Sequence, residues 1–106
     1  MPNEMKKKRL DGAALRQHAD EASRLLKTIG NPIRLMILCT LVEGEYAVGE
    51  LNERIAQSQS TLSQHLAILR REGIVQTRRE AQTIYYSLNS TEVRSLMEWL
   101  YKTYCR

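Results

Sequence analysis

Phenylalanine is absent from the sequence, and tryptophan occurs once, at Trp99. The sequence also lacks an apolar run of about 18 residues, which excludes a membrane-spanning helix of ordinary length. Its amino terminus has charged residues but no apolar segment after them, so it does not have the pattern of a secretory signal. We therefore expect a cytoplasmic protein that has no membrane partner.

Cysteine and histidine are scarce. Each occurs twice, and two cysteines in a reducing compartment are not expected to form a structural disulfide. A zinc site commonly needs about four nitrogen, sulfur or oxygen ligands, and the sequence offers no evident set of them, so we expect no metal and no other cofactor. A glycine-rich phosphate loop and a nucleophile paired with a base are also missing. The sequence therefore does not predict an enzyme.

The composition is that of one ordinary globular domain. The 106 residues are 42% hydrophobic and 26% charged, with a formal net charge of +4. This charge is compatible with a polyanionic partner but does not establish one. Because residues 6–9 are basic, we expect residues 1–10 to form a disordered basic tail, either solvated or acting as a DNA arm. Residues 11–106 are expected to form the folded domain.

Apolar spacing and capping residues predict a mainly α-helical fold with one small β-hairpin. Helices are expected over residues 12–29, 32–43, 48–55 and 59–72, with Asp11, Asn31 and Ser58 as caps. β-branched and aromatic residues predict strands over 74–79 and 83–88, but no Asn-Gly or Asp-Gly turn fixes their register. Asn89, followed three residues later by Glu92, predicts a capping box that opens a last helix.

The third and fourth helices, joined by a tight turn, have the pattern of a helix-turn-helix. Side chains that can bond base edges or phosphates are grouped at the start and on the outer face of the fourth helix, and again near the tip of the hairpin. The DNA-binding residues predicted in this way are Ser58, Gln59, Ser60, Thr61, Ser63, Gln64, His65, Arg70, Arg78, Arg79 and Gln82. An alternative is that the helix is only a polar surface helix. For His65 we favour a hydrogen bond to a neighbouring helix, with a DNA contact also possible.

Two segments resemble the ArsR/SmtB family of bacterial regulators. Residues 58–70 with Glu72-Gly73-Ile74-Val75 are similar to its recognition-helix signature, and residues 26–35 are similar to the entry to its second helix. The resemblance implies a winged helix-turn-helix homodimer that binds a near-palindromic operator in double-stranded DNA and usually represses, with its terminal helices paired across the dimer. An apolar stripe on the last helix independently favours a partner, unless this helix packs only on its own first helix.

The signal is inferred from a narrower resemblance. One metal site of the family needs cysteines in the third helix, and none occurs there. The surroundings of Cys39 and Cys105, together with residues 82–86, resemble the BigR, SqrR and HlyU branch of the family. This resemblance implies that Cys39 and Cys105 form a disulfide or polysulfide bridge in response to reactive sulfur species or oxidants, and that DNA is then released.

Three other functions remain open. Cys39 in an apolar helix is compatible with an inert core residue, and the chain is then a DNA-binding regulator without an inducer, which acts by anti-silencing. A metal-sensing repressor is a weaker alternative. The third is a small interaction module whose basic helix binds an acidic protein rather than DNA.

Overall fold

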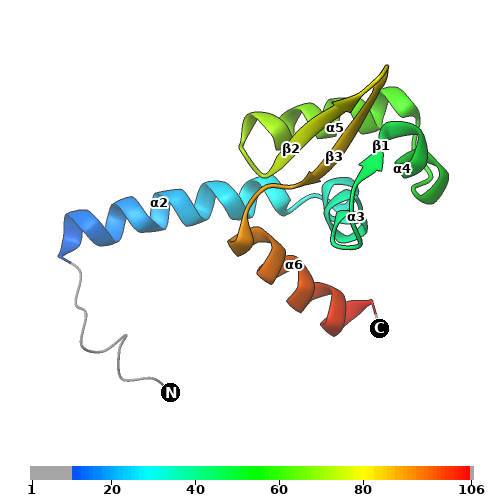
Figure 1. The fold of residues 1–106 in the computed structure, drawn as a ribbon. Coiled ribbons are helices and arrows are strands. Elements are labelled where there is room, and N and C mark those ends of the chain that lie inside the picture. Colours follow the sequence, from blue (N-terminus) through cyan, green and yellow to red (C-terminus); the bar gives the residue numbers. More distant parts are fainter. Residues whose placement is uncertain (1–10, 106) are drawn as a thin grey trace.

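A computed structural model of the chain describes residues 11–105. The basic tail expected at residues 1–10 lies outside the described residues. The elements follow in the order α2 (Gly12–Ile29), α3 (Pro32–Leu41), β1 (Tyr46–Ala47), α4 (Val48–Arg54), α5 (Gln59–Arg71), β2 (Val75–Glu80), β3 (Thr83–Leu88) and α6 (Thr91–Tyr104). Figure 1 shows α2 projecting from the body that the other elements form. The mainly α-helical fold with a small β wing is thus confirmed.

Side-chain caps begin the helices where the sequence predicted. Asp11 accepts a hydrogen bond from the backbone N–H of Ala14 at 2.8 Å, and Asn31 accepts from the N–H groups of the residues that open α3. Ser58 accepts from the N–H of Thr61 at 3.1 Å. Each cap satisfies a donor that has no partner within its helix. The ends differ slightly from the prediction, because α3, α4 and α5 stop one or two residues early.

The cap of the last helix was predicted wrongly. Ser90, not Asn89, accepts a hydrogen bond from the N–H of Val93 at 3.1 Å, and its hydroxyl donates to the Glu92 carboxylate at 3.0 Å. Asn89 is held at the end of β3 instead, since its backbone N–H donates to the carbonyl of Ile74 and its side-chain amide to the carbonyl of Gly73. These two bonds fix Asn89 outside the helix.

The wing is a three-stranded antiparallel sheet in the order β1-β3-β2. Strand β1 was not expected, because two residues are too few to show a pattern. The pairs Val75↔Leu88 through Glu80↔Thr83 set the register of the hairpin and leave Ala81 and Gln82 as its turn. Ala81 has a φ of 57°. This left-handed conformation costs a non-glycine residue about 1–2 kcal/mol.

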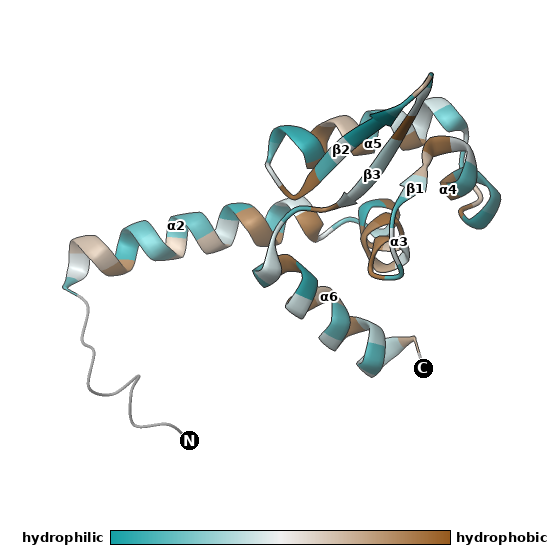
Figure 2. Ribbon diagram, viewed as in Figure 1, coloured by the Kyte–Doolittle hydropathy of each residue, from teal (hydrophilic) through white to brown (hydrophobic). Residues whose placement is uncertain are grey.

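The core lies where α3, α5, α6 and the sheet meet. Helix α3 contributes Ile37, Leu38 and Leu41, all without solvent exposure, and α5 contributes a row of buried leucines at helical spacing, namely Leu62, Leu66 and Leu69. Figure 2 places hydrophobic residues on α2 and α6 as well as on α3. Since leucines on α2 and aromatic side chains on α6 are exposed, not all of the apolar surface of these two helices is buried inside one chain.

Candidate functional site

Helices α4 and α5 form a helix-turn-helix with a tight connection. The side-chain amide of Asn52 donates to the carbonyl of Gln57, which closes the turn between the helices. Because the leucines of α5 are buried, its opposite face is free for polar side chains. Gln59, Ser60, Ser63 and Gln64 are exposed on that face, and Arg70 is exposed in its last turn. A helix presented in this way fits the major groove of B-DNA, where glutamine can bond adenine with two hydrogen bonds.

Several of the predicted DNA-binding residues also have partners within the fold. The Ser58 hydroxyl caps α5 and donates to the Thr61 hydroxyl at 2.9 Å. His65 is half-buried, and its Nδ1 accepts a hydrogen bond from Nη1 of Arg34, on α3, at 3.2 Å. Burial, and then the charge of Arg34, lower the pKa of His65. The neutral imidazole therefore joins α5 to α3, as the favoured interpretation of His65 expected.

The wing carries the other predicted DNA-binding residues. Arg79 and Gln82 are exposed near the tip, and Gln82 lines a hollow of about 280 Å³ together with Gln59 from the start of α5. Arg78 is engaged instead. Its guanidinium donates to both carboxylate oxygens of Glu45 at 2.9–3.2 Å and lies 4.9 Å from the centre of the Tyr85 ring. The hydrogen bond from Arg78 is the main reason why the pKa of Glu45 is lowered.

The two cysteines meet at one apolar hollow between α3 and α6. Cys39 is half-buried on α3 and Cys105 is exposed just beyond the last turn of α6. The hollow has a volume of about 400 Å³, and its other walls come from Leu35, Met36, Leu100 and Tyr104. Burial raises the pKa of the Cys39 thiol, and the nearby Cys105 raises it further through its charge and a hydrogen bond. Two residues that are far apart in the sequence thus share one site.

No metal site accompanies the cysteines in the described part of the chain. Within residues 11–105, no group of three or more His, Cys, Asp or Glu side chains could hold a metal ion. The same residues contain no helix that is long and apolar enough to cross a membrane.

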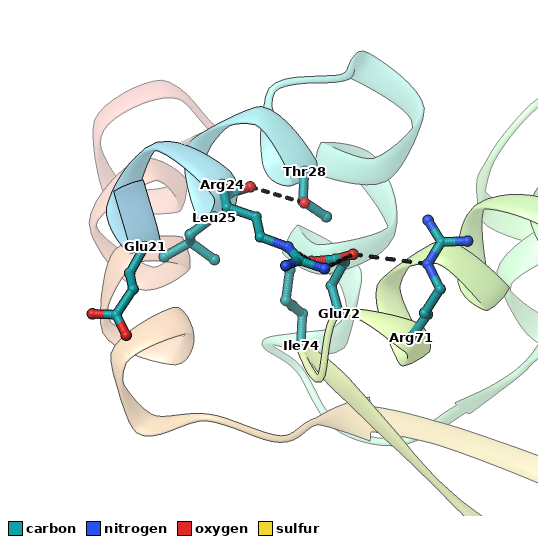
Figure 3. A pocket seen from close by; sticks show the side chains of 7 residues that line it. All are labelled: Glu21, Arg24, Leu25, Thr28, Arg71, Glu72 and Ile74. Carbon is teal, nitrogen blue, oxygen red and sulfur yellow. Dashed lines mark hydrogen bonds and ion pairs between the residues drawn. The ribbon is translucent and has the colours of Figure 1, made fainter. Parts of the chain in front are cut away.

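An ion pair that the sequence did not indicate joins α2 to the end of α5. Figure 3 shows the Arg24 guanidinium, from α2, on the carboxylate of Glu72, the C-cap of α5. The Arg24 Nε donates to one carboxylate oxygen at 2.7 Å and Nη2 to the other at 3.0 Å. Hydrogen bonds from Arg24 lower the pKa of Glu72. No local pattern could reveal a contact between residues 48 positions apart, and the same is true of Arg34 with His65.

Large apolar side chains are exposed along the projecting helix α2 and along α6. They are Leu15 and Leu26 on α2, and Trp99, Tyr101 and Tyr104 on α6. Helix α6 packs against α3 and β3 of its own chain, yet these side chains face solvent. Exposed apolar surface of this extent is typical of a protein–protein contact.

A helix-turn-helix with a polar outer face and an adjoining β wing defines a winged helix-turn-helix protein, a class in which the second helix enters the DNA major groove. Residues 31–77 match the model of the bacterial regulatory protein, arsR family. The chain belongs to this family and is a transcription regulator. The resemblance found in the sequence is therefore confirmed.

Similar proteins support the assignment along most of the chain. The transcriptional activator HlyU of Vibrio cholerae is 51% identical over 87% of this chain and 85% of its own length. The biofilm growth-associated repressor of Xylella fastidiosa is 47% identical over 86% of this chain and 80% of its own.

Solved structures agree with this assignment. Reduced HlyU from V. cholerae has a TM-score of 0.84 at 50% identity, covering 88% of this chain and 98% of that one. The transcriptional repressor BigR from X. fastidiosa has a TM-score of 0.79 at 44% identity, covering 92% and 99%. These relatives include an activator and a repressor.

Proposed function

We propose that the chain binds a near-palindromic operator in double-stranded DNA as a homodimer, and that a bridge between Cys39 and Cys105 switches this binding off. The observation that carries the proposal is that both cysteines line one hollow between α3 and α6. Helix α3 also holds the recognition helix, since the two pack together and Arg34 bonds His65. Because Cys39 is on α3, a change at this residue can reach the DNA-binding surface through a single helix.

Recognition of DNA is assigned to α5 and the tip of the wing. We expect Gln59 and Gln64 to contact base edges, with Ser60, Ser63 and Arg70 bonding bases or phosphates beside them. Arg79 and Gln82 reach the backbone or the adjacent minor groove from the wing. Ser58 and Thr61 set the start of the recognition helix, and His65 anchors it, in addition to any DNA contact they make. Arg78 joins this surface only if it leaves Glu45.

The dimer is assigned to α2 and α6, whose exposed apolar side chains would be covered by a second copy of the chain. A two-fold axis would then place two α5 helices about 34 Å apart, one turn of B-DNA. An operator that overlaps a promoter would be repressed by such a dimer, as the family resemblance suggests.

The switching chemistry is assigned first to Cys105, because it is exposed and Cys39 has a raised pKa. The Cys105 thiolate attacks the outer sulfur of a persulfide RSSH, which gives Cys105–SSH and releases the thiolate RS⁻. The Cys39 thiolate then attacks the Cys105 sulfur of that group, and a disulfide forms with release of HS⁻. If Cys39 has also become a persulfide, the two groups condense to a trisulfide and H₂S.

The test is a binding titration with a palindromic duplex selected by the protein from a random library. We expect reduced protein to bind tightly and persulfide-treated protein to bind roughly 5–150-fold more weakly, the usual range for coupling between two sites. Intact mass should show loss of both free thiols, and dithiothreitol should restore binding. Cys39→Ser and Cys105→Ser proteins should keep binding after treatment. If they still release DNA, the cysteine switch is wrong.

A second candidate is a regulator without an inducer, acting by anti-silencing. The half-buried position of Cys39 and its raised pKa favour it, because a thiol in this state reacts slowly. It predicts the same operator affinity before and after persulfide or peroxide. Unchanged mass under both reagents would make this the better interpretation.

A further inference from the structure

We infer that the Arg24–Glu72 ion pair fixes the angle between α2 and α5, and thereby sets the spacing of DNA half-sites that the dimer accepts. The inference rests on the proposed function, in which α2 is part of the dimer contact and α5 enters the major groove. It assigns to two residues outside the DNA surface a role in choosing between operators.

The ion pair connects α2 to the C-terminal end of α5. Glu72 is the C-cap of the recognition helix, and its side chain is 13% exposed, whereas the side chain of Arg24 is 74% exposed. Arg24 approaches it from α2 with two parallel hydrogen bonds at 2.7 and 3.0 Å, and Arg71 adds an ion pair at 3.8 Å. A bidentate guanidinium–carboxylate contact restricts orientation as well as distance. The pair therefore holds α2 in one direction relative to α5.

The chemistry of α5 alone does not account for Glu72. A negative charge at the C-terminus of a helix opposes the helix dipole and destabilises the helix slightly. The preceding turn already carries Arg70 and Arg71, which suit that position. The Arg24 guanidinium compensates for the unfavourable charge, so Glu72 is better explained by the contact between helices than by the stability of α5.

The shape of α2 makes its angle important. The helix has 18 residues, so at a rise of about 1.5 Å per residue it is about 27 Å long. Its buried residues, Thr28 and Ile29, lie at its C-terminal end, while Leu15 is exposed near the other end. A tilt of about 10° at the buried end would move the far end by about 5 Å, which exceeds the rise of one base pair, about 3.4 Å. A small loss of angular restraint would thus change which half-site separation the dimer fits.

The experiment compares spacing profiles rather than single affinities. The selected operator and versions with one base pair added or removed between the half-sites are titrated with wild-type protein and with Arg24→Gln. We expect the affinity of wild-type protein to fall roughly tenfold or more when the spacing is changed in either direction, within the range of coupling between sites. Arg24→Gln should lose less than about threefold, with a lower affinity for the original operator. Glu72→Gln should behave in the same way.

Two controls separate positioning from stability. Arg16→Gln removes an ion pair with Asp20 that lies entirely within α2, so it should keep the wild-type spacing profile. The exchanged pair, Arg24→Glu with Glu72→Arg, should restore much of the discrimination. Each variant is first checked for its helix content and its dimer by circular dichroism and sedimentation.

The outcomes distinguish the inference from the proposed function. A folded, dimeric Arg24→Gln protein with the wild-type spacing profile overturns the inference alone, as does a wild-type protein that binds all spacings equally. A wild-type protein that is monomeric, or that binds no duplex, overturns the proposed function and this inference with it.

Discussion

Bridging Cys39 and Cys105 is expected to change the free energy of unfolding by an amount that can be estimated from their positions. The bridge closes a loop of about 66 residues, and on the chain-entropy model this stabilises the fold by about 4 kcal/mol. The bridge can release DNA only if it holds the chain in an arrangement that the unbridged protein disfavours. On the usual range of coupling free energies, this arrangement costs about 1–3 kcal/mol. The net gain should therefore be about 1–3 kcal/mol.

The assay is urea unfolding of reduced and bridged protein, followed by far-ultraviolet circular dichroism. Protein concentration must be held constant, because the stability of a dimer depends on it. Both the midpoint and the slope should be fitted, since a cross-linked unfolded chain exposes less surface and lowers the slope. The Cys105→Ser protein, treated with the same oxidant, is the matched control and should unfold as its reduced form does.

The result can refute the reasoning in two ways. A bridged protein that is equally stable or less stable would mean that the cysteines cannot join without large distortion of α3 or α6. A gain near the full 4 kcal/mol, with DNA affinity unchanged, would mean that the bridge forms in the DNA-binding arrangement. In the second case the bridge would stabilise the fold without regulating DNA binding.

Four further predictions concern single side chains. Gln64→Ala should weaken binding to the selected operator by about 1–3 kcal/mol and relax the base preference, and equal losses of affinity on specific and random DNA would contradict base recognition. Arg79→Ala should weaken binding to all duplexes and lower the slope of affinity against salt concentration by about one. Because the fold lowers the pKa of His65, the unfolded state binds the proton more readily than the folded state. The free energy of unfolding should therefore fall as pH decreases below the ordinary value of 6.5. Urea titrations from pH 7.5 to 5.5, about one unit either side of that value, should show this decrease in wild-type protein and a smaller one in His65→Gln. Glu45→Gln should remove the closer of the two ion pairs of Arg78, leaving the one with Glu80 at 3.6 Å, and steepen the salt dependence of DNA binding by about one phosphate contact. An unchanged slope would show that Arg78 gains no contact with the DNA backbone when Glu45 is neutral.

Local patterns were enough to predict the helices and the hairpin. The buried leucines of α5 recur at helical spacing and the caps Asp11, Asn31 and Ser58 each act on the nearest free N–H groups. The residues that make up each of these signals lie close together in the sequence, so the signals can be recognised without knowledge of the rest of the fold. The cap at Asn89 was predicted wrongly because the deciding contacts are not local: hydrogen bonds to Ile74 and Gly73, just before β2, hold Asn89 outside the helix and leave Ser90 as the cap.

Contacts between distant segments were beyond the reach of these patterns. The ion pair of Arg78 with Glu45 joins residues 33 positions apart, and strand β1 exists only because β3 lies beside it. Charged residues at such positions have the same sequence appearance whether they face solvent or each other. The composition of the candidate site could therefore be predicted, but which of its arginines are already engaged could not.

The two cysteines lie outside the fully buried core, since Cys39 is only half-buried and Cys105 is exposed. Substitutions away from a packed core usually change stability little. A lineage could therefore gain, lose or replace either thiol without rebuilding the helices that hold the recognition surface. In the proposed function, the thiols that would sense the signal are thus separate from the buried residues that hold the DNA-binding scaffold together.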